Sequence, residues 1–363
     1  MISWKKLGWQ MNLPNPSVIV PNRPDFFKNK VVFVDGLIGG GKGLMSSVVG
    51  ALPRVEMWVS RQAIENVCGV HHLEHISMEG AVSLIKNWAD QEIYNSSMSR
   101  DVNFRFKDMS SVFRDARPWR YFLRLFQGDG KEAIQRVFSQ NLILNYMTHV
   151  NTPYAEPIFK AFGDRLVYVR LTRCPKSEYM LNHLARWSQR WGEDVDGMIM
   201  HLKIGDNLKA RVPFYALGWE EEYRKSSPME RAVLMLREWQ QRGNDVLDRL
   251  KKVSQATIIE VPFEKFVMEP DTYIENIANA LDTKVDRLTR RMMKKQGVPR
   301  ASLADAPRNQ TYINLGWKAP DSKKTAFQEF EEGREVAKKT VSSHLMYVLD
   351  KISDDYIQRY DIK

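Results

Sequence analysis

Cysteine is nearly absent from this sequence, which has two in 363 residues, Cys68 and Cys174. So few cysteines argue against a disulfide framework and leave no cysteine-based metal site. No apolar run approaches the ~20 residues that a membrane-spanning helix needs, and residues 1–20 lack the continuous apolar core of a signal peptide. Low-complexity tracts and fixed-period repeats are also missing. These absences predict a globular, cytoplasmic protein with no membrane span.

Positive charge is in excess, because 54 lysines and arginines face 44 aspartates and glutamates, a formal net charge of +10. Such an excess fits an anionic ligand such as a nucleotide, a nucleic acid or an acidic glycan. The basic residues are spread along the chain, with modest clusters at 105–120 and 287–295. A nucleic-acid surface is usually marked by a concentrated basic stripe. Solvated helix faces are the simpler interpretation, so we expect no nucleic acid partner.

Three continuously apolar, β-branched stretches predict buried strands, at 30–36, 163–173 and 256–266. Helical spacing of apolar residues separates them, at 43–52, 177–191, 227–253 and 271–281. Ser227 and Pro228 mark the start of the longest helix, and Asp271 opens the last. Strands that alternate with helices predict an α/β fold, with a parallel β-sheet flanked by helices on both faces.

No linker divides the chain, so we predict one α/β domain over residues 29–363. Residues 1–28 are rich in Asn and Pro and predict an irregular N-terminal arm. A largely helical insertion is expected at about 60–145, after a possible short strand at 55–60. The C-terminal part, about 297–363, is expected to combine an irregular stretch with one or two helices.

The first predicted strand runs into a glycine-rich loop, with five glycines among residues 36–43. Gly36-x-x-x-x-Gly41-Lys42 has the spacing of a phosphate-binding loop, in which backbone N–H groups and a helix N-terminus hold the anion. Kinases and nucleoside triphosphatases carry Ser or Thr after the lysine to hold magnesium. Here that residue is Gly43, so a donor that needs no metal fits better. The candidate binding residues are Gly36, Leu37, Ile38, Gly39, Gly40, Gly41, Lys42, Gly43 and Leu44.

Two later segments of the sequence carry further motifs, and both follow the glycine loop along the chain. In residues 146–187, a Thr-His loop with His149 precedes the second strand, which ends at Arg173-Cys174-Pro175. In residues 257–282, a strand is followed by an E-x-F motif, a proline and a helix. With the glycine loop, these segments resemble the sulfotransferase family, whose donor is 3′-phosphoadenosine 5′-phosphosulfate (PAPS). The resemblance implies a fold like that of the P-loop nucleoside triphosphatases.

The resemblance also implies residue roles. The glycine loop would hold the 5′-phosphosulfate, with Lys42 stabilising the bridging oxygen as the S–O bond breaks. Arg173 and a residue of the helix behind it would hold the 3′-phosphate. His149 would be the general base, for which an ordinary histidine pKa of ~6.5 is suitable.

Several positions depart from the family pattern. The loop lacks the family's threonines. Where a serine commonly follows the arginine by eight residues, this chain has Leu181, and the nearest polar residue is Asn182. Ser177 is another candidate for the 3′-phosphate, and Arg170 is an alternative to Arg173.

The base and the acceptor remain open. Glu65, or a histidine of the cluster His71, His72 and His75, is an alternative to His149. If helical, His71 and His75 would share a face that could hold a metal, but no carboxylate companion is evident and no metal is expected. The acceptor is predicted to be a hydroxyl or amine of a small molecule or glycan, with the aromatic stretches 114–126 and 186–191 as candidate contacts. A P-loop nucleoside or nucleotide kinase and a catalytically silent nucleotide- or polyanion-binding module are the alternative functions.

Overall fold

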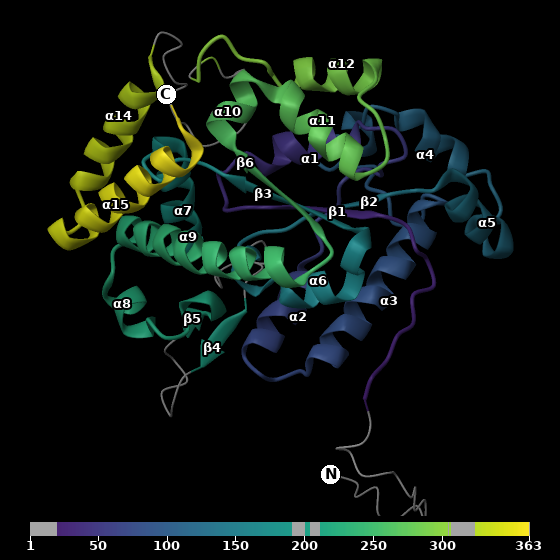
Figure 1. The fold of residues 1–363 in the computed structure, drawn as a ribbon, viewed down its shortest axis with the longest axis horizontal. Coiled ribbons are helices and arrows are strands. Elements are labelled where there is room, and N and C mark those ends of the chain that lie inside the picture. The colour runs from purple at the N-terminus through teal and green to yellow at the C-terminus, as the bar shows by residue number, and fades with distance from the viewer. Residues whose placement is uncertain (1–19, 191–199, 204–210, 304, 306–323, 363) are drawn as a thin grey trace, which may run out of the picture.

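A computed structural model describes residues 20–190, 200–203, 211–303, 305 and 324–362. Its centre is a four-stranded parallel sheet in the order β2-β1-β3-β6 (Figure 1). The strands are β1 (Val31–Asp35), β2 (Leu144–Met147), β3 (Leu166–Thr172) and β6 (Thr257–Pro262). Val31 of β1 pairs with Leu144 on one side and Leu166 on the other. The predicted α/β class with a parallel sheet is confirmed.

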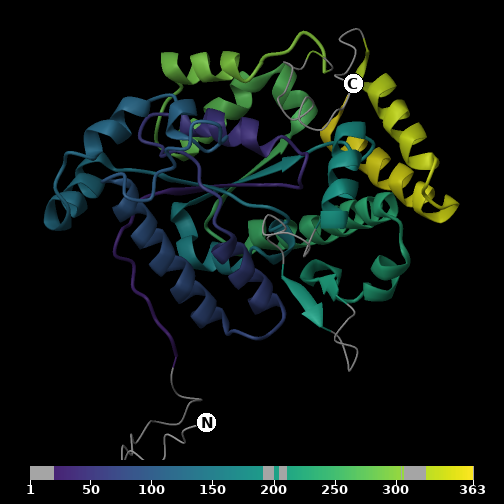
Figure 2. The same ribbon diagram turned by 180° about the vertical axis from the view of Figure 1, so that it is seen from behind.

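Helices cover both faces of the sheet (Figures 1 and 2). Val32 and Val34 pack into the core shared with α1 (Lys42–Gly50), α10 (Phe263–Met268), α11 (Pro270–Ala280) and α12 (Arg287–Lys295). Val31 and Phe33 face the other core, with α2 (Gln62–His72), α3 (Met78–Ser96), α6 (Glu156–Phe162) and α9 (Pro228–Val253). Because both sides are buried, the strands are apolar at most positions instead of alternating between apolar and polar residues.

The other elements lie around this frame. Helices α4 (Pro118–Arg124) and α5 (Gly130–Gln140) follow α3, with a 3₁₀ turn η3 (Val112–Arg114) before α4. Helix α7 (Glu178–Arg190) packs against α9 and α14 (Ala326–Lys338), and α15 (Ser343–Tyr360) also packs on α9. A hairpin of β4 (His201–Lys203) and β5 (Arg211–Pro213), helix α8 (Glu220–Lys225) and the 3₁₀ turns η4 (Thr152–Tyr154), η5 (Gly163–Arg165) and η7 (Phe214–Ala216) complete the described part. None of the helices described there is long and apolar enough to cross a membrane.

The predicted strands at 30–36 and 163–173 and the main helices are found. The third predicted strand, 256–266, was right only in its first part, because β6 ends at Pro262 and residues 263–266 belong to helix α10. Helix α9 begins after Ser227, whose side chain forms a capping box with Glu230. Helix α11 begins at Pro270, one residue before the predicted Asp271. Helices α2 to α5 occupy the predicted insertion, and α14 and α15 are the expected late helices. Trp191, at the end of the predicted 177–191 helix, lies outside the described residues.

Two expectations about strands were wrong or incomplete. Strand β2 was not predicted, because Asn145 interrupts its three apolar residues; this amide is fully buried and donates to the backbone oxygen of Ser46 at 3.1 Å. The possible strand at 55–60 is reduced to two isolated bridges, Val55 with Ile143 and Val59 with Tyr146. In the arm, residues 20–30 form no helix or strand.

Candidate active site

The loops that follow β1, β2 and β3 meet at one edge of the sheet, because the carboxyl ends of parallel strands all lie there. The amide of Val150, after β2, donates to the oxygen of Gly36 at 3.4 Å. Arg173, after β3, donates from Nη1 to the oxygen of Gly39 at 3.3 Å. The glycine loop is therefore in contact with both the Thr-His loop and the arginine turn, although these are more than a hundred residues away in sequence.

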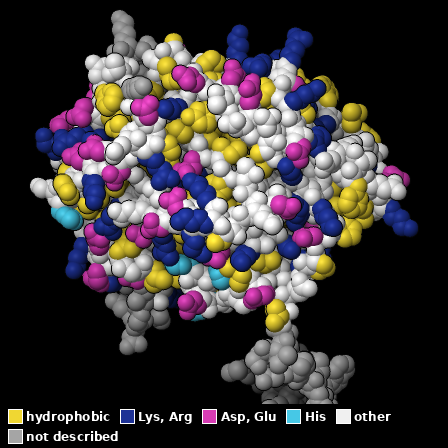
Figure 3. Space-filling view, in the orientation of Figure 1, with side chains coloured by type: hydrophobic (Ala, Val, Ile, Leu, Met, Phe, Trp, Pro, Cys, Tyr) yellow, Lys and Arg dark blue, Asp and Glu magenta, His cyan; other side chains and the backbone are white. Residues whose placement is uncertain are grey.

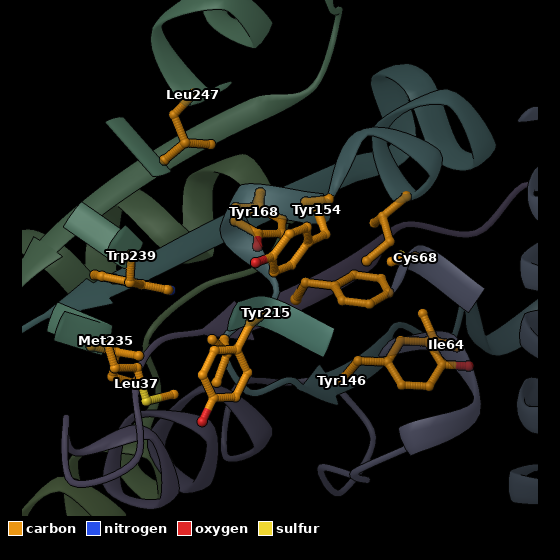
Figure 4. Packing of buried hydrophobic residues seen from close by; sticks show 14 of the residues in the cluster. Leu37, Ile64, Cys68, Tyr146, Tyr154, Tyr168, Tyr215, Met235, Trp239 and Leu247 are labelled. Carbon is orange, nitrogen blue, oxygen red and sulfur yellow. The ribbon is translucent and has the colours of Figure 1, made fainter. Parts of the chain in front are cut away.

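Glycine is required at several points of the first loop. Gly39 and Gly41 have φ angles of 86° and 94°, in the left-handed region that other residues rarely adopt. A Cβ atom on Gly41 would lie 2.5 Å from the ring of Phe263. Leu37 anchors the loop to the core below, where it lies beside side chains of α9 such as Trp239 (Figure 4). Ile38 packs against the same core.

Helix α1 starts directly after this loop and presents a helix N-terminus to it. Gly41 is the N-cap residue, and neither a capping side chain nor an acidic residue stands in the first turn. The first N–H groups of the helix and its positive dipole end are thus suited to an anion. Gly43 lies next to Met109, whose Cε would be 3.6 Å from an added Cβ, an ordinary contact. The position therefore has room for a side chain.

Lys42 lies under the loop and is 5% exposed. Its ammonium donates to the backbone oxygens of Gly36 at 2.8 Å and Leu37 at 2.9 Å. Burial lowers the pKa of Lys42 to about 8, against the opposing attraction of the Asp35 and Glu65 carboxylates. This cation is held in place without a direct ion pair to either carboxylate in the described structure.

Asp35, at the end of β1, holds the Thr-His loop. Its fully buried carboxylate accepts hydrogen bonds from the Thr148 hydroxyl at 2.9 Å and from the amides of Asn151 at 3.2 Å and Thr152 at 2.7 Å. These bonds fix the chain on both sides of His149. A carboxylate with three such donors keeps the loop in one arrangement.

His149 is paired with Glu65 of α2. The Glu65 carboxylate accepts from the backbone amide of His149 at 3.0 Å and lies 3.3 Å from its Nδ1. The imidazole is about one quarter exposed. In the tautomer in which Nδ1 donates to Glu65, Nε2 is the unprotonated nitrogen. The predicted base and its predicted alternative therefore form one unit.

The histidines of the 71–75 cluster do not form the metal pair that a shared helix would allow. Helix α2 ends at His72, so His71 and His75 do not share a helix, and the geometry on which a metal pair depended is not formed. His72 packs on the ring of Tyr154 and lies beside Arg242; partial burial, with Arg242 next, lowers its pKa to about 4. Within the described ranges, no three His, Cys, Asp or Glu side chains come together as a metal site.

Arg173 connects the glycine loop to the C-terminal helices. Besides its bond to Gly39, it donates from Nη2 to Oε1 of Glu329 in α14 at 3.2 Å. Its guanidinium lies over the rings of Phe263 at 4.4 Å and Tyr179 at 5.2 Å. The side chain is thus fixed next to the loop, with its planar fork at hand for an anion.

The other candidates for a 3′-phosphate differ in position. Leu181 has no polar group, and its side chain is fully buried in the apolar core. This side chain therefore cannot bind a phosphate. Asn182 donates to Glu178 one turn earlier on α7, at 3.4 Å. The Ser177 hydroxyl is buried and has no hydrogen-bond partner among the described residues. Arg170 is fully buried, lies over the Trp239 ring at 4.4 Å and bonds to Asn244, which indicates a structural role.

The sequence analysis overlooked His183. A Cβ on Gly39 would lie 3.2 Å from that of His183, so the imidazole of α7 supports the glycine loop from below. Burial, followed by the charges of Arg173, Arg186 and Lys42, lowers its pKa to about 4. His183 is therefore neutral near pH 7. Nothing in the helical spacing could show which face of α7 meets the loop.

The C-terminal helices hold the arginine turn in place. Glu264 of α10 accepts from the amide of Cys174 at 3.0 Å and from the hydroxyl of Tyr356 in α15. Lys176 forms an ion pair with Asp350 at 3.0 Å. Gly333 of α14 packs so closely that an added Cβ would lie 1.8 Å from the oxygen of Lys176. Residues 173–176 are thus enclosed between α10 and the α14–α15 pair.

No family model and no curated protein matches the chain. Several solved structures are similar to it, including the following three. The sulfotransferase domain of the Synechococcus PCC 7002 olefin synthase is 14% identical, with a TM-score of 0.43, over 93% of this chain and 98% of that one. The sulfotransferase domain of the curacin biosynthetic pathway is 9% identical, with a TM-score of 0.39, over 85% and 98%. Sulfotransferase STF9 from Mycobacterium avium is 10% identical, with a TM-score of 0.40, over 93% and 79%. At these identities and scores the likeness identifies neither donor nor acceptor, and the function proposed below rests on the residues of this chain.

Proposed function

We propose that this chain is a sulfotransferase that moves a sulfuryl group from PAPS to a hydroxyl or amine. The observation that carries the proposal is the contact between Arg173 and Gly39, which joins the arginine turn to the phosphate loop. PAPS carries two anionic groups, on the 5′ and 3′ sides of one ribose. A glycine loop and an arginine that are in contact suit such a donor better than they suit a linear triphosphate.

The chemistry requires positioning and charge neutralisation more than covalent participation. The N–H groups at the start of α1 would hold the 5′-phosphate, and Lys42 would stabilise the negative charge that develops on the bridging oxygen. Arg173 would bind the 3′-phosphate through its fork, in place of Glu329. Ser177, whose buried hydroxyl has no hydrogen-bond partner among the described residues, follows the same turn and is a second candidate for this phosphate. Leu181 takes no part in this proposal.

His149 would take the proton from the acceptor as the sulfur–oxygen bond forms. Its neighbour Glu65 supports this role, since a carboxylate on Nδ1 orients the ring and stabilises the imidazolium that results. Well-placed general-base catalysis contributes on the order of 10²–10⁴ in rate. Glu65 is thereby a positioning residue and not the base itself.

The kinase alternative finds less support in the residues of the loop. Gly43 offers no hydroxyl, and the next hydroxyl on that side of α1, Ser47, donates to the oxygen of Gly43 at 2.6 Å. A silent binding module would need no oriented base, and the Glu65–His149 pair favours an enzyme. A cytoplasmic location and an acceptor on a small molecule or glycan remain predictions.

The proposal is tested by incubating the full chain with PAPS carrying radioactive sulfur and a panel of phenols, alkyl alcohols, amines and glycans. We expect label in at least one acceptor, lost in Lys42→Met and kept in Lys252→Met, a change of an exposed lysine at the end of α9. Label moving from γ-labelled ATP, with none from PAPS, would identify a kinase. Binding of both nucleotides without transfer to any acceptor would identify a binding module.

A further inference from the structure

Large apolar side chains are concentrated on one surface segment. Of the sixteen that are exposed in the described part of the chain, seven lie between residues 106 and 126. Phe126 is 89% exposed, Trp119 75% and Phe106 74%. A folded protein rarely leaves so many large apolar groups together in water unless they meet a partner. The six used below are Phe106, Met109, Trp119, Leu123, Leu125 and Phe126, here called the apolar segment.

The rings of this segment rest on one another, which gives it a defined surface. The centroids of Phe106 and Phe113 are 4.4 Å apart, and Phe122 lies 5.9 Å from Phe113 and 5.7 Å from Trp119. Beneath them, Arg124 and Glu56 form a buried ion pair at 2.7 Å that holds α4 in place. The segment is therefore built into the fold and does not depend on a partner to take shape.

Positive charge surrounds the same surface. Residues 105–126 and 287–295 together carry eleven lysines and arginines and two aspartates. Of those aspartates, Asp108 pairs with Arg105 and the Asp115 side chain is 3% exposed. Figure 3 shows dark blue side chains along the edge formed by α12, with yellow side chains nearby on the side of α4. Arg117 and Arg290 pair with Asp286 and Asp271. Five of the remaining exposed cations, Lys107, Arg114, Arg291, Lys294 and Lys295, are here called the basic rim.

The apolar segment and the basic rim are one continuous surface. A groove between them is lined by Trp119 and Pro118 on one side and by Arg291, Met292 and Lys295 of α12 on the other. Lys295 also donates to the backbone oxygen of Arg114 at 3.3 Å. Its pKa is lowered by partial burial and then by the neighbouring charge of Arg114, which the Asp115 carboxylate opposes.

We propose that this surface docks the protein on an anionic lipid bilayer, with the apolar segment in the headgroup–acyl boundary and the basic rim against lipid phosphates. Trp, Phe and Leu next to Lys and Arg are the residues that interfacial binding uses. A nucleic acid fits less well, because Met109, Leu123 and Leu125 have no flat face for a base to stack on. The bilayer would also lie close to the candidate active site, since Met109 is the residue next to Gly43. An amphiphilic acceptor could then enter the site from the membrane.

The test is co-flotation of the full chain with vesicles of phosphatidylcholine alone or with part of it replaced by phosphatidylserine. We expect flotation with the anionic vesicles only, weakening as salt is added. Trp119→Ser with Phe126→Ser, and separately Arg291→Ala with Lys294→Ala, should reduce it, the latter by about fivefold for each cation removed. Matched controls are Val253→Ser with Tyr347→Ser and Lys339→Ala with Lys351→Ala, which are exposed elsewhere and should float like the wild type.

Equal flotation with both vesicle types, or equal loss in the controls, overturns the proposal. So does binding of a single-stranded oligonucleotide that the same variants abolish when vesicles are not bound. A dimer in solution that Trp119→Ser with Phe126→Ser dissociates, without vesicle binding, would assign the surface to a second copy. Because the readout is binding to lipid, its failure leaves the proposed transfer reaction untouched.

Discussion

Arg173 and Glu329 form an ion pair of 3.2 Å across 156 residues of sequence, and both side chains are nearly buried. The arginine that we expect to hold the donor's 3′-phosphate thus already binds a carboxylate from α14. In the proposed function, binding of the 3′-phosphate is an exchange, in which the phosphate replaces Glu329 on the guanidinium. Helix α14 is therefore part of the proposed donor site.

Glu329→Gln should therefore strengthen binding of 3′-phosphoadenosine 5′-phosphate (PAP) several-fold, since it removes a competitor worth about 1 kcal/mol. The free protein should lose stability, because Arg173 loses its ionised partner. Calorimetric titration and thermal unfolding measure the two effects. Glu332→Gln is the control on the same helix, where the carboxylate pairs with Lys324 at 2.6 Å and should not affect PAP. Weaker binding by Glu329→Gln would mean that Glu329 assists the nucleotide.

The affinity for PAP should fall as the pH rises above about 8. The folded protein holds Lys42 with a pKa of about 8, lowered by burial, so the ammonium that attracts the phosphate is present below that pH and lost above it. If only the protonated form binds, the dissociation constant increases up to about tenfold per pH unit. Titrations of PAP between pH 7 and 9.5 test this. The affinity of Lys42→Met for PAP should be weak and should not depend on pH. If the PAP affinity of the wild type were as independent of pH as that of Lys42→Met, Lys42 would not be a ligand of the phosphate.

His149→Gln should slow sulfuryl transfer by about 10²–10⁴ and leave PAP affinity within twofold, because the base acts on the acceptor and not on the nucleotide. Glu65→Gln should cost less, roughly tenfold, because the imidazole loses the carboxylate that orients it through Nδ1. Single-turnover transfer from PAPS measures both. The control His75→Gln changes an exposed histidine of the same region and should leave the transfer rate unchanged. Equal rates for His149→Gln and the wild type would move the base elsewhere.

Gly43→Ser should tighten PAP binding by about two- to tenfold, the value of one added hydrogen bond. The site has room, because the nearest atom to an added Cβ is Met109 Cε at 3.6 Å. Serine should also stabilise α1 slightly, since glycine is unfavourable inside a helix. Thermal unfolding and calorimetry check both effects. Gly41→Ser is the contrasting variant, and should unfold the loop because its φ is 94° and Phe263 lies 2.5 Å from the new Cβ.

Much of this fold could be predicted, because its strands and helices follow from local patterns of apolar and capping residues in the sequence. The strands at Val31–Asp35 and Leu166–Thr172 are largely apolar runs, and Ser227 with Pro228 marks the start of α9 in the sequence itself. Strand β2 escaped because a buried polar group, Asn145, obtains its hydrogen bonds from Ser46, which is a tertiary contact. No single-sequence pattern reports such a partner.

Lys42, His149 and Arg173 lie on three loops that meet at one edge of the sheet. The positions of the glycine loop and the Arg173 turn could be predicted, because the strands before them were predicted. The position of His149 could not, because it follows β2, the strand that was missed. Leu181 was predicted because the family commonly has a serine eight residues after the arginine. In this chain the residue at that position is buried in the apolar core. The positions of Glu329 and His183 depend on how α14 and α7 pack, which residue spacing does not encode.

The central claim is that the glycine loop and Arg173 together bind an adenosine nucleotide with phosphates on both its 5′ and 3′ sides. The most direct test is the shift in thermal unfolding by PAP, compared with ADP and with ATP plus magnesium, in the wild type and Arg173→Ala. A hundredfold excess over the dissociation constant should stabilise the wild type by about 2.7 kcal/mol. We expect this shift with PAP, little shift with ADP or ATP, and no shift with PAP in Arg173→Ala. Greater stabilisation by ATP with magnesium, unchanged in Arg173→Ala, would contradict it.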